Sequence, residues 1–220
     1  MIHFIKTRYR VMLCALASAS IMCLSIAACN RAALRIPGAS LSFPDTPTLY
    51  VAQKTYPYKV AVAMPTDLRT DHYGERVAGT SWTGCQTDAL WGNEASSLIQ
   101  NRVSTELGAS KLFANVHHGD SAAGVVVVRS EIHAFCSQVV GFIFGRVAGI
   151  TALNITVERD GKVLLKQKFE RVVTDADPEY TGSQAGFIEQ AMRVTMADSL
   201  RELLRDLLQR LEREAASWRD

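Results

Sequence analysis

The segment from Asn154 to Phe169, NITVERDGKVLLKQKF, indicates the fold more clearly than any other part of the chain. Apolar and polar residues alternate on both sides of its central Asp160-Gly161 pair. Alternation with a period of two predicts strands with one buried face, and Asp-Gly between two such strands is a strong β-hairpin signal. The sequence therefore predicts two long antiparallel strands, Val147–Arg159 and Lys162–Val173.

Several segments before this hairpin also have the character of strands. Gly124–Cys136 contains four consecutive valines and then alternates, whereas Tyr58–Met64 is a shorter apolar run. Thr48–Ala52 and Leu112–Val116 are further short candidates. The stretch Thr66–Gly92 is predicted as a long irregular loop, part of which packs against the domain because it contains two tryptophans and a cysteine.

A first helix is predicted after this loop. Leu98, Val103 and Leu107 form an apolar stripe at helical spacing. Asn93 is a candidate N-cap and Gly108 a candidate C-cap, since these residue types are common at the two ends of helices.

A second, longer helix is predicted over Phe187–Trp218, about thirty residues or roughly 45 Å at ~1.5 Å per residue. Because this length exceeds that of a small domain, its last turns are expected to overhang the sheet and to leave Leu207, Leu208 and Leu211 uncovered. The order of elements predicts an α+β two-layer sandwich, in which a mostly antiparallel sheet of four to five strands carries both helices on one face.

The N-terminus has a different composition. Lys6, Arg8 and Arg10 precede eighteen uncharged residues, Val11–Ala28. A basic region, an apolar run and small residues at its end are typical of a secretory signal peptide. A permanent membrane-spanning helix is the alternative, because eighteen apolar residues just reach the length that a bilayer requires.

The tetrad IAAC, which ends at Cys29, resembles the lipobox of bacterial lipoproteins. The resemblance implies that the signal peptide 1–28 is removed and that Cys29 carries covalent diacylglycerol and acyl groups, with no other cofactor. Pro37, Pro44 and Pro47 lie in a stretch without hydrophobic periodicity, which predicts a flexible tether over 29–47 before a single periplasmic domain over 48–218. Asn30 in place of an aspartate suggests sorting to the outer rather than the inner membrane.

The body of the chain resembles two kinds of envelope protein in its element order and in the phrases Leu107-Gly108 and Leu112–Val116. These are the auxiliary lipoproteins of ABC-type lipid-transport systems and the N-terminal domain of TolB-like proteins. The resemblance covers roughly residues 55–212 and implies an accessory role in the envelope.

Loss of residues 1–28 changes the charge and cysteine content. The number of Lys and Arg residues falls from 24 to 21 while all 22 acidic residues remain, so the mature chain carries about one negative charge. This balance gives no reason to expect a nucleic-acid partner. Cys85 and Cys136 are the cysteines left in the domain. They either form a disulfide or remain buried free thiols, and the sequence does not choose between the two.

No catalytic or metal-binding motif stands out. The sequence lacks Gly-x-Ser-x-Gly, a phosphate loop, a dinucleotide fingerprint and His-Glu-x-x-His. His117 and His118, followed by Asp120, are predicted to form an exposed polar turn rather than a metal site. The acidic stretch Asp175–Glu179 lacks the glycine and the final acid of a calcium loop. We therefore expect no enzyme and no bound metal.

One apolar stretch stands out between two predicted strands. In Gly141–Gly149, glycines recur every four residues around Phe142, Ile143, Phe144 and Arg146. The stretch is predicted as a bulged or wide hairpin, whose apolar tip could contact a membrane surface or a partner, with Arg146 at its rim. A pair of close-packed membrane helices is the alternative.

These observations leave three hypotheses for the function. The first is a non-enzymatic docking or accessory lipoprotein that is anchored in the outer membrane and has an envelope protein as its partner. The second is a carrier of a lipid or small apolar ligand held between sheet and helices. The third is a periplasmic hydrolase that uses His72 or His133, for example Ser81 together with His72. The leucines near the end of the last helix are compatible with self-association, and equally with a helix that bends back over the sheet.

Overall fold

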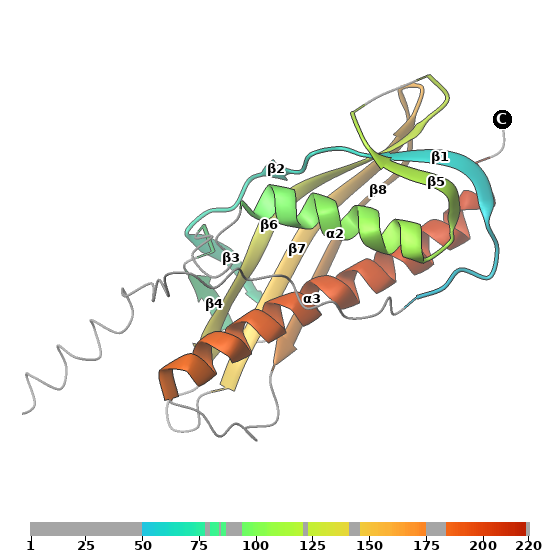
Figure 1. Ribbon diagram of the computed structural model, residues 1–220. Coiled ribbons are helices and arrows are strands. Elements are labelled where there is room, and N and C mark those ends of the chain that lie inside the picture. The colour runs from blue at the N-terminus through green and yellow to red at the C-terminus, as the bar shows by residue number, and fades with distance from the viewer. Residues whose placement is uncertain are drawn as a thin grey trace, which may run out of the picture. The chain divides into compact units, whose positions relative to one another are not determined.

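The computed structural model describes residues 50–77, 80–83, 85–86, 94–120, 123–140, 146–174 and 184–218 (Figure 1). The chain divides into two compact units, Met1–Ala39 and Ser40–Asp220, and all described residues belong to the second. Several sequence predictions lie outside the described residues: the signal peptide, Cys29, the tether, Asn93, the acidic stretch 175–179, and the tip residues Phe142, Ile143 and Phe144.

Three long antiparallel strands form one side of the sheet: β6 (Val126–Val140), β7 (Arg146–Arg159) and β8 (Lys162–Thr174). The β7–β8 hairpin predicted from Asp160-Gly161 is confirmed. Asp160 has φ 50° and Gly161 has φ 78°, and positive φ at both positions is what a tight type I′ hairpin turn requires.

The other side of the sheet is parallel. Strand β1 (Tyr56–Val62) lies between β5 (Phe113–His118) and β6 and is parallel to both, while the short β2 (Thr66–Asp67) continues along β6. The order is β5-β1-β6-β7-β8. The parallel pair β1–β5 is possible because a long connection that includes a helix separates the two strands. The residues before β1 are not a strand, so the expected strand over Thr48–Ala52 is not found in its described part.

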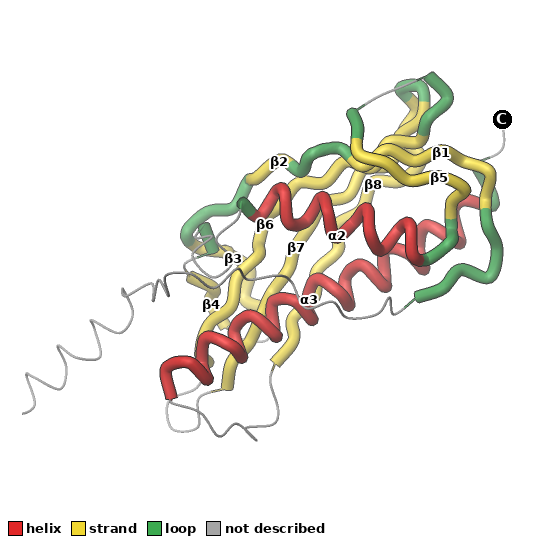
Figure 2. Tube along the Cα trace, viewed as in Figure 1, coloured by secondary structure: helices red, strands yellow, loops and turns green. Residues whose placement is uncertain are grey.

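The two helices, α2 (Ala95–Ala109) and α3 (Gln184–Ala215), cover one face of this sheet (Figures 1 and 2). The α+β sandwich with a long final helix is thereby confirmed. The caps of α2 differ from the prediction: Glu94 occupies the N-cap position, and the helix continues through Gly108 to a C-cap at Ser110. A serine replaces the expected glycine because its Oγ donates to the Leu107 carbonyl and accepts from a following amide.

The expected overhang of α3 is wrong. Leu207, Leu208 and Leu211 are at most 2% exposed and belong to the main core. The physical reason is strand length. Fourteen residues of β7 span about 46 Å at ~3.3 Å each, which nearly equals about 48 Å for the 32 residues of α3. Beyond the helix, Trp218 stacks on Phe113 with 6.0 Å between ring centroids.

The opposite face of the sheet carries a second, smaller core. A hairpin of β3 (His72–Val77) and β4 (Thr80–Thr83) packs there, with Trp82 1% exposed. The cluster comprises Tyr73, Trp82, Cys85, Ala134, Cys136, Ala148, Ile150 and Ala152. The predicted irregular loop 66–92 therefore contains a two-stranded sheet, and the expectation that part of it packs down is confirmed.

Candidate functional site

Strands β6 and β7 lie on either side of the predicted apolar tip, and their ends next to it are paired with each other. The pairing of β6 with β7 continues to Val139↔Val147 and Val140↔Arg146. Val139 is 48% exposed, and Arg146 is exposed as well. Gly149 lies inside β7, which contradicts the alternative of a pair of membrane helices. Within the described ranges, no helix has the length and apolar character needed to cross a membrane.

A disulfide joins Cys85 to Cys136, with 4.8 Å between their Cα atoms and a sequence separation of 51. Cys85 follows β4, and Cys136 lies near the end of β6. The bond thus attaches the segment after the β3–β4 hairpin to the sheet.

A polar contact attaches the same hairpin to the edge strand β8. The Tyr73 hydroxyl donates a hydrogen bond of 2.5 Å to the Glu170 carboxylate. Lys168 Nζ lies 3.1 Å from that carboxylate and 5.5 Å from the centroid of the Tyr73 ring. Burial, and then the hydrogen bond to Glu170, raise the pKa of Tyr73 to about 12.

The histidines proposed as catalytic have other partners. His72 is exposed and lies 3.5 Å from the Asp71 carboxylate. His133 is the extra residue of a β-bulge in β6, where its Nε2 lies 2.8 Å from the Asn154 amide and 3.6 Å from Glu131.

His117 and His118 are exposed, as expected, but they lie at the end of strand β5 rather than in a turn. In the part of the chain that the structure describes, no group of three His, Cys, Asp or Glu residues could hold a metal ion.

The layer between sheet and helices is filled with side chains. Ile132, Leu153 and Ile155 from the sheet and Leu200 and Leu203 from α3 are all 0% exposed. This packing does not favour a carrier that holds an apolar ligand between the two layers.

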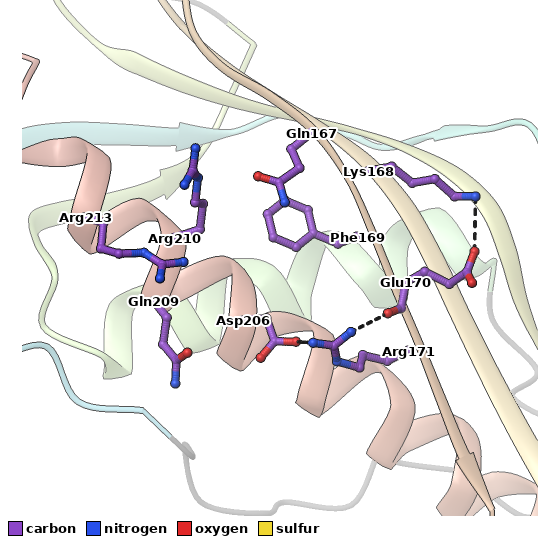
Figure 3. Close-up of a pocket in the computed structure, with 9 residues that line it drawn as sticks. All are labelled: Gln167, Lys168, Phe169, Glu170, Arg171, Asp206, Gln209, Arg210 and Arg213. Carbon is purple, nitrogen blue, oxygen red and sulfur yellow. Dashed lines mark hydrogen bonds and ion pairs between the residues drawn. The ribbon is translucent and has the colours of Figure 1, made fainter.

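A polar groove of about 370 Å³ lies between β8 and the C-terminal half of α3. Its lining is shown in Figure 3 and comprises Gln167, Lys168, Phe169, Glu170, Arg171, Asp206, Gln209, Arg210 and Arg213. Five of these residues are consecutive in β8. Because successive side chains of a strand point to opposite faces, the groove follows the outer edge of this strand. Among the described strands, β8 pairs with β7 alone.

Sequence reasoning did not predict this groove. The arginines of α3 belong to the charged face that a surface helix is expected to expose, and the lysines of β8 to the polar face of a strand. One sequence feature could have indicated the groove: the spacing of Asp206, Gln209, Arg210 and Arg213 places four polar residues along one side of a helix. Only the packing of α3 against β8 brings them to one cavity.

Comparisons with known proteins establish similarity of fold. No protein-family model and no curated protein matches the sequence. A crystal structure of a Xanthomonas campestris protein assigned to the family DUF330 aligns with a TM-score of 0.51 and 14% identity, over 78% of this chain and 92% of that chain.

Two further structures align less well. A point variant of the PelC dodecamer from Paraburkholderia phytofirmans gives a TM-score of 0.40 and 12% identity, over 74% of this chain and 93% of that chain. A minor lipoprotein from Acinetobacter baumannii gives a TM-score of 0.39 and 11% identity, over 73% of this chain and 93% of that chain. At such scores the last two support no argument. The chain thus shares the fold of the Xanthomonas campestris protein.

Proposed function

We propose that this protein is a lipid-anchored lipoprotein of the cell envelope, and that its domain is a non-enzymatic docking or accessory component of an envelope assembly or transport system. The observation that carries the proposal is the N-terminal sequence, in which a basic segment and an uncharged run end in the IAAC tetrad at Cys29. Asn30 supports a location in the outer membrane with the domain in the periplasm.

The surface proposed for docking is the end of the β6–β7 hairpin. Val139 on β6 and Arg146 on β7 are exposed there, and the residues between these strands include Phe142 and Phe144. An exposed aliphatic residue such as Val139 at the end of a paired strand is suited to an apolar contact with another protein.

The anchor is tested by replacing its cysteine. Cys29→Ser is expected to abolish incorporation of labelled fatty acid and to leave the signal peptide uncleaved, because the thiol that carries the lipid is gone. Cys23→Ser is the matched control, since it changes the same atom six residues earlier in the apolar run. Intact mass and fatty-acid labelling measure both variants. An unchanged mass and undiminished labelling of Cys29→Ser would refute the proposed anchor.

The docking surface is tested by site-specific photo-crosslinking in cells. A photoreactive residue at Val139 is expected to give an adduct with another envelope protein, identified by mass spectrometry, and this adduct should disappear when Ile143→Asp is added. Val163 is the control position: it is 53% exposed but lies beside the Asp160-Gly161 turn, at the other end of β7. Equal adducts from both positions, or adducts with this chain alone, would contradict a specific docking role.

The non-enzymatic part of the proposal rests on the sequence, which contains none of the catalytic motifs considered above. Its test is a double variant, His72→Ala with His133→Ala, which should retain full function in cells that depend on the protein. Loss of function with normal protein levels would favour the hydrolase instead.

A further inference from the structure

The groove between β8 and α3 carries more positive than negative charge. Four of its lining residues are basic and two are acidic. Both acidic residues already have basic partners within the groove: Lys168 Nζ lies 3.1 Å from Glu170, and Arg171 pairs with Asp206. The two remaining basic residues of the lining both lie on α3, and the lining contains no third carboxylate that could pair with them.

These two residues are Arg210 and Arg213. Arg210 pairs with Glu214 at 2.8 Å, one turn further along α3, yet its Nε is buried and has no hydrogen-bond partner in the described part of the chain. Arg213 lies in the last turn of α3 and is exposed. A guanidinium group has five N–H donors, so the contact with Glu214 leaves other donors of Arg210 for an oxyanion in the groove.

The neutral part of the lining complements the two arginines. Figure 3 shows the amide of Gln167 on the β8 side of the groove and the guanidinium groups of Arg210 and Arg213 on the α3 side. Phe169, 7% exposed, lies on the β8 side with Gln167. Hydrogen-bond donors therefore line the groove on both sides, from β8 and from α3.

We propose that this groove binds a phosphate-bearing anion, with Arg210 and Arg213 as charged donors and Gln167 as a neutral donor. A phosphate monoester carries about −1.5 to −2 charges near pH 7 and has three strong acceptor oxygens, which suits two guanidinium groups and an amide. A carboxylate has one charge and two oxygens, and a single guanidinium can satisfy both in a bidentate contact. The cavity volume of about 370 Å³ is in the range of small-ligand sites.

This inference depends neither on the lipid anchor nor on the docking surface. Two sources could supply the phosphate group: a dissolved phosphorylated molecule or the headgroup of a membrane lipid. The groove chemistry is the same for both, so the experiment has to separate them.

The test follows the unfolding temperature of the full-length protein in a non-ionic detergent, at constant ionic strength, as ligand is added. The probes are inorganic phosphate, glycerol 3-phosphate, and short-chain phosphatidic acid, a lipid with a phosphate monoester, with phosphatidylcholine as its control. We expect a saturable stabilisation by at least one phosphate probe. Arg213→Gln should raise the dissociation constant about tenfold, the loss typical of one charge-assisted hydrogen bond.

Arg129→Gln is the matched control, because it removes the same charge from an exposed position on β6 outside the groove. Stabilisation by both dissolved phosphates but not by phosphatidic acid would identify a dissolved ligand. Stabilisation by phosphatidic acid that exceeds that of glycerol 3-phosphate would identify a lipid headgroup. The proposal is overturned if no probe saturates, if Arg129→Gln weakens binding as much as Arg213→Gln, or if a hexaglutamate peptide binds more tightly than every phosphate.

Discussion

Gly149 on β7 lies directly against the backbone of Thr195 on α3. A Cβ atom added to Gly149 would come within 2.4 Å of the Thr195 carbonyl carbon and within 2.5 Å of the Met196 nitrogen. Two residues further along β7, the Thr151 hydroxyl and the Ser199 hydroxyl of α3 form a hydrogen bond of 2.7 Å in which both residues are 0% exposed. Small residues on both elements thus allow the long helix to approach the sheet closely.

Replacement of Gly149 by alanine should destabilise the domain strongly. The added methyl group meets backbone rather than the end of a flexible side chain, so strand and helix have to separate, at a cost of about 1–3 kcal/mol or more. Chemical denaturation measures the loss. Gly108→Ala is the control with the same chemistry: nothing lies within 4 Å of its added methyl group, and alanine in a helix should stabilise by about 0.5–1 kcal/mol. Equal effects of the two substitutions would contradict the close contact.

Reduction of the Cys85–Cys136 disulfide should lower the free energy of unfolding by about 2–4 kcal/mol, because the bond closes a long loop in the unfolded chain. Urea unfolding with and without a reductant measures this difference. The double variant Cys85→Ala with Cys136→Ala should be as unstable as the reduced protein and should not respond to the reductant. A wild-type protein that is equally insensitive would show that the two thiols are free.

The pKa of Tyr73 should make stability fall at alkaline pH. An unfolded tyrosine loses its proton near pH 10, whereas the folded group keeps its proton up to a pKa of about 12. The unfolded state therefore binds fewer protons in this window, and the free energy of unfolding decreases as pH rises from about 10 to about 12. Tyr73→Phe should abolish this part of the decrease.

Absorbance of tyrosinate provides an independent measurement. Glu170→Gln should lower the pKa of Tyr73, because it removes the carboxylate that accepts the hydrogen bond of the hydroxyl group and repels the phenolate. If the titration of Tyr73 were identical in wild-type protein and in Glu170→Gln, the hairpin would not contact β8 as described.

Truncation of Leu211 should be costly although the residue lies near the end of the long helix. Leu211 is 0% exposed, and Leu211→Ala should lower the free energy of unfolding by about 2–5 kcal/mol. Gln209→Ala, at an exposed position two residues earlier, should change stability by less than about 0.5 kcal/mol. If Leu211→Ala were as mild as the control, the helix end would project beyond the sheet, as the sequence alone had predicted.

Local sequence patterns determined the elements of this fold. Alternation around Asp160-Gly161 predicted the β7–β8 hairpin, and an amphipathic pattern with helical spacing predicted the long helix. Both depend on residues that are close in the chain, so turn chemistry and periodicity suffice. The order of these elements was enough to predict an α+β sandwich.

Tertiary structure alone decided how distant segments meet. The insertion of β1 between β5 and β6, the burial of Leu211, and the groove between β8 and α3 all depend on pairings between parts of the chain far apart in sequence. The disulfide between Cys85 and Cys136 was one of two outcomes open from sequence, and the packing of the β3–β4 hairpin on the far face selects it. Such contacts depend on strand lengths and on which small residues permit close approach, and neither can be read from the local pattern of any one segment.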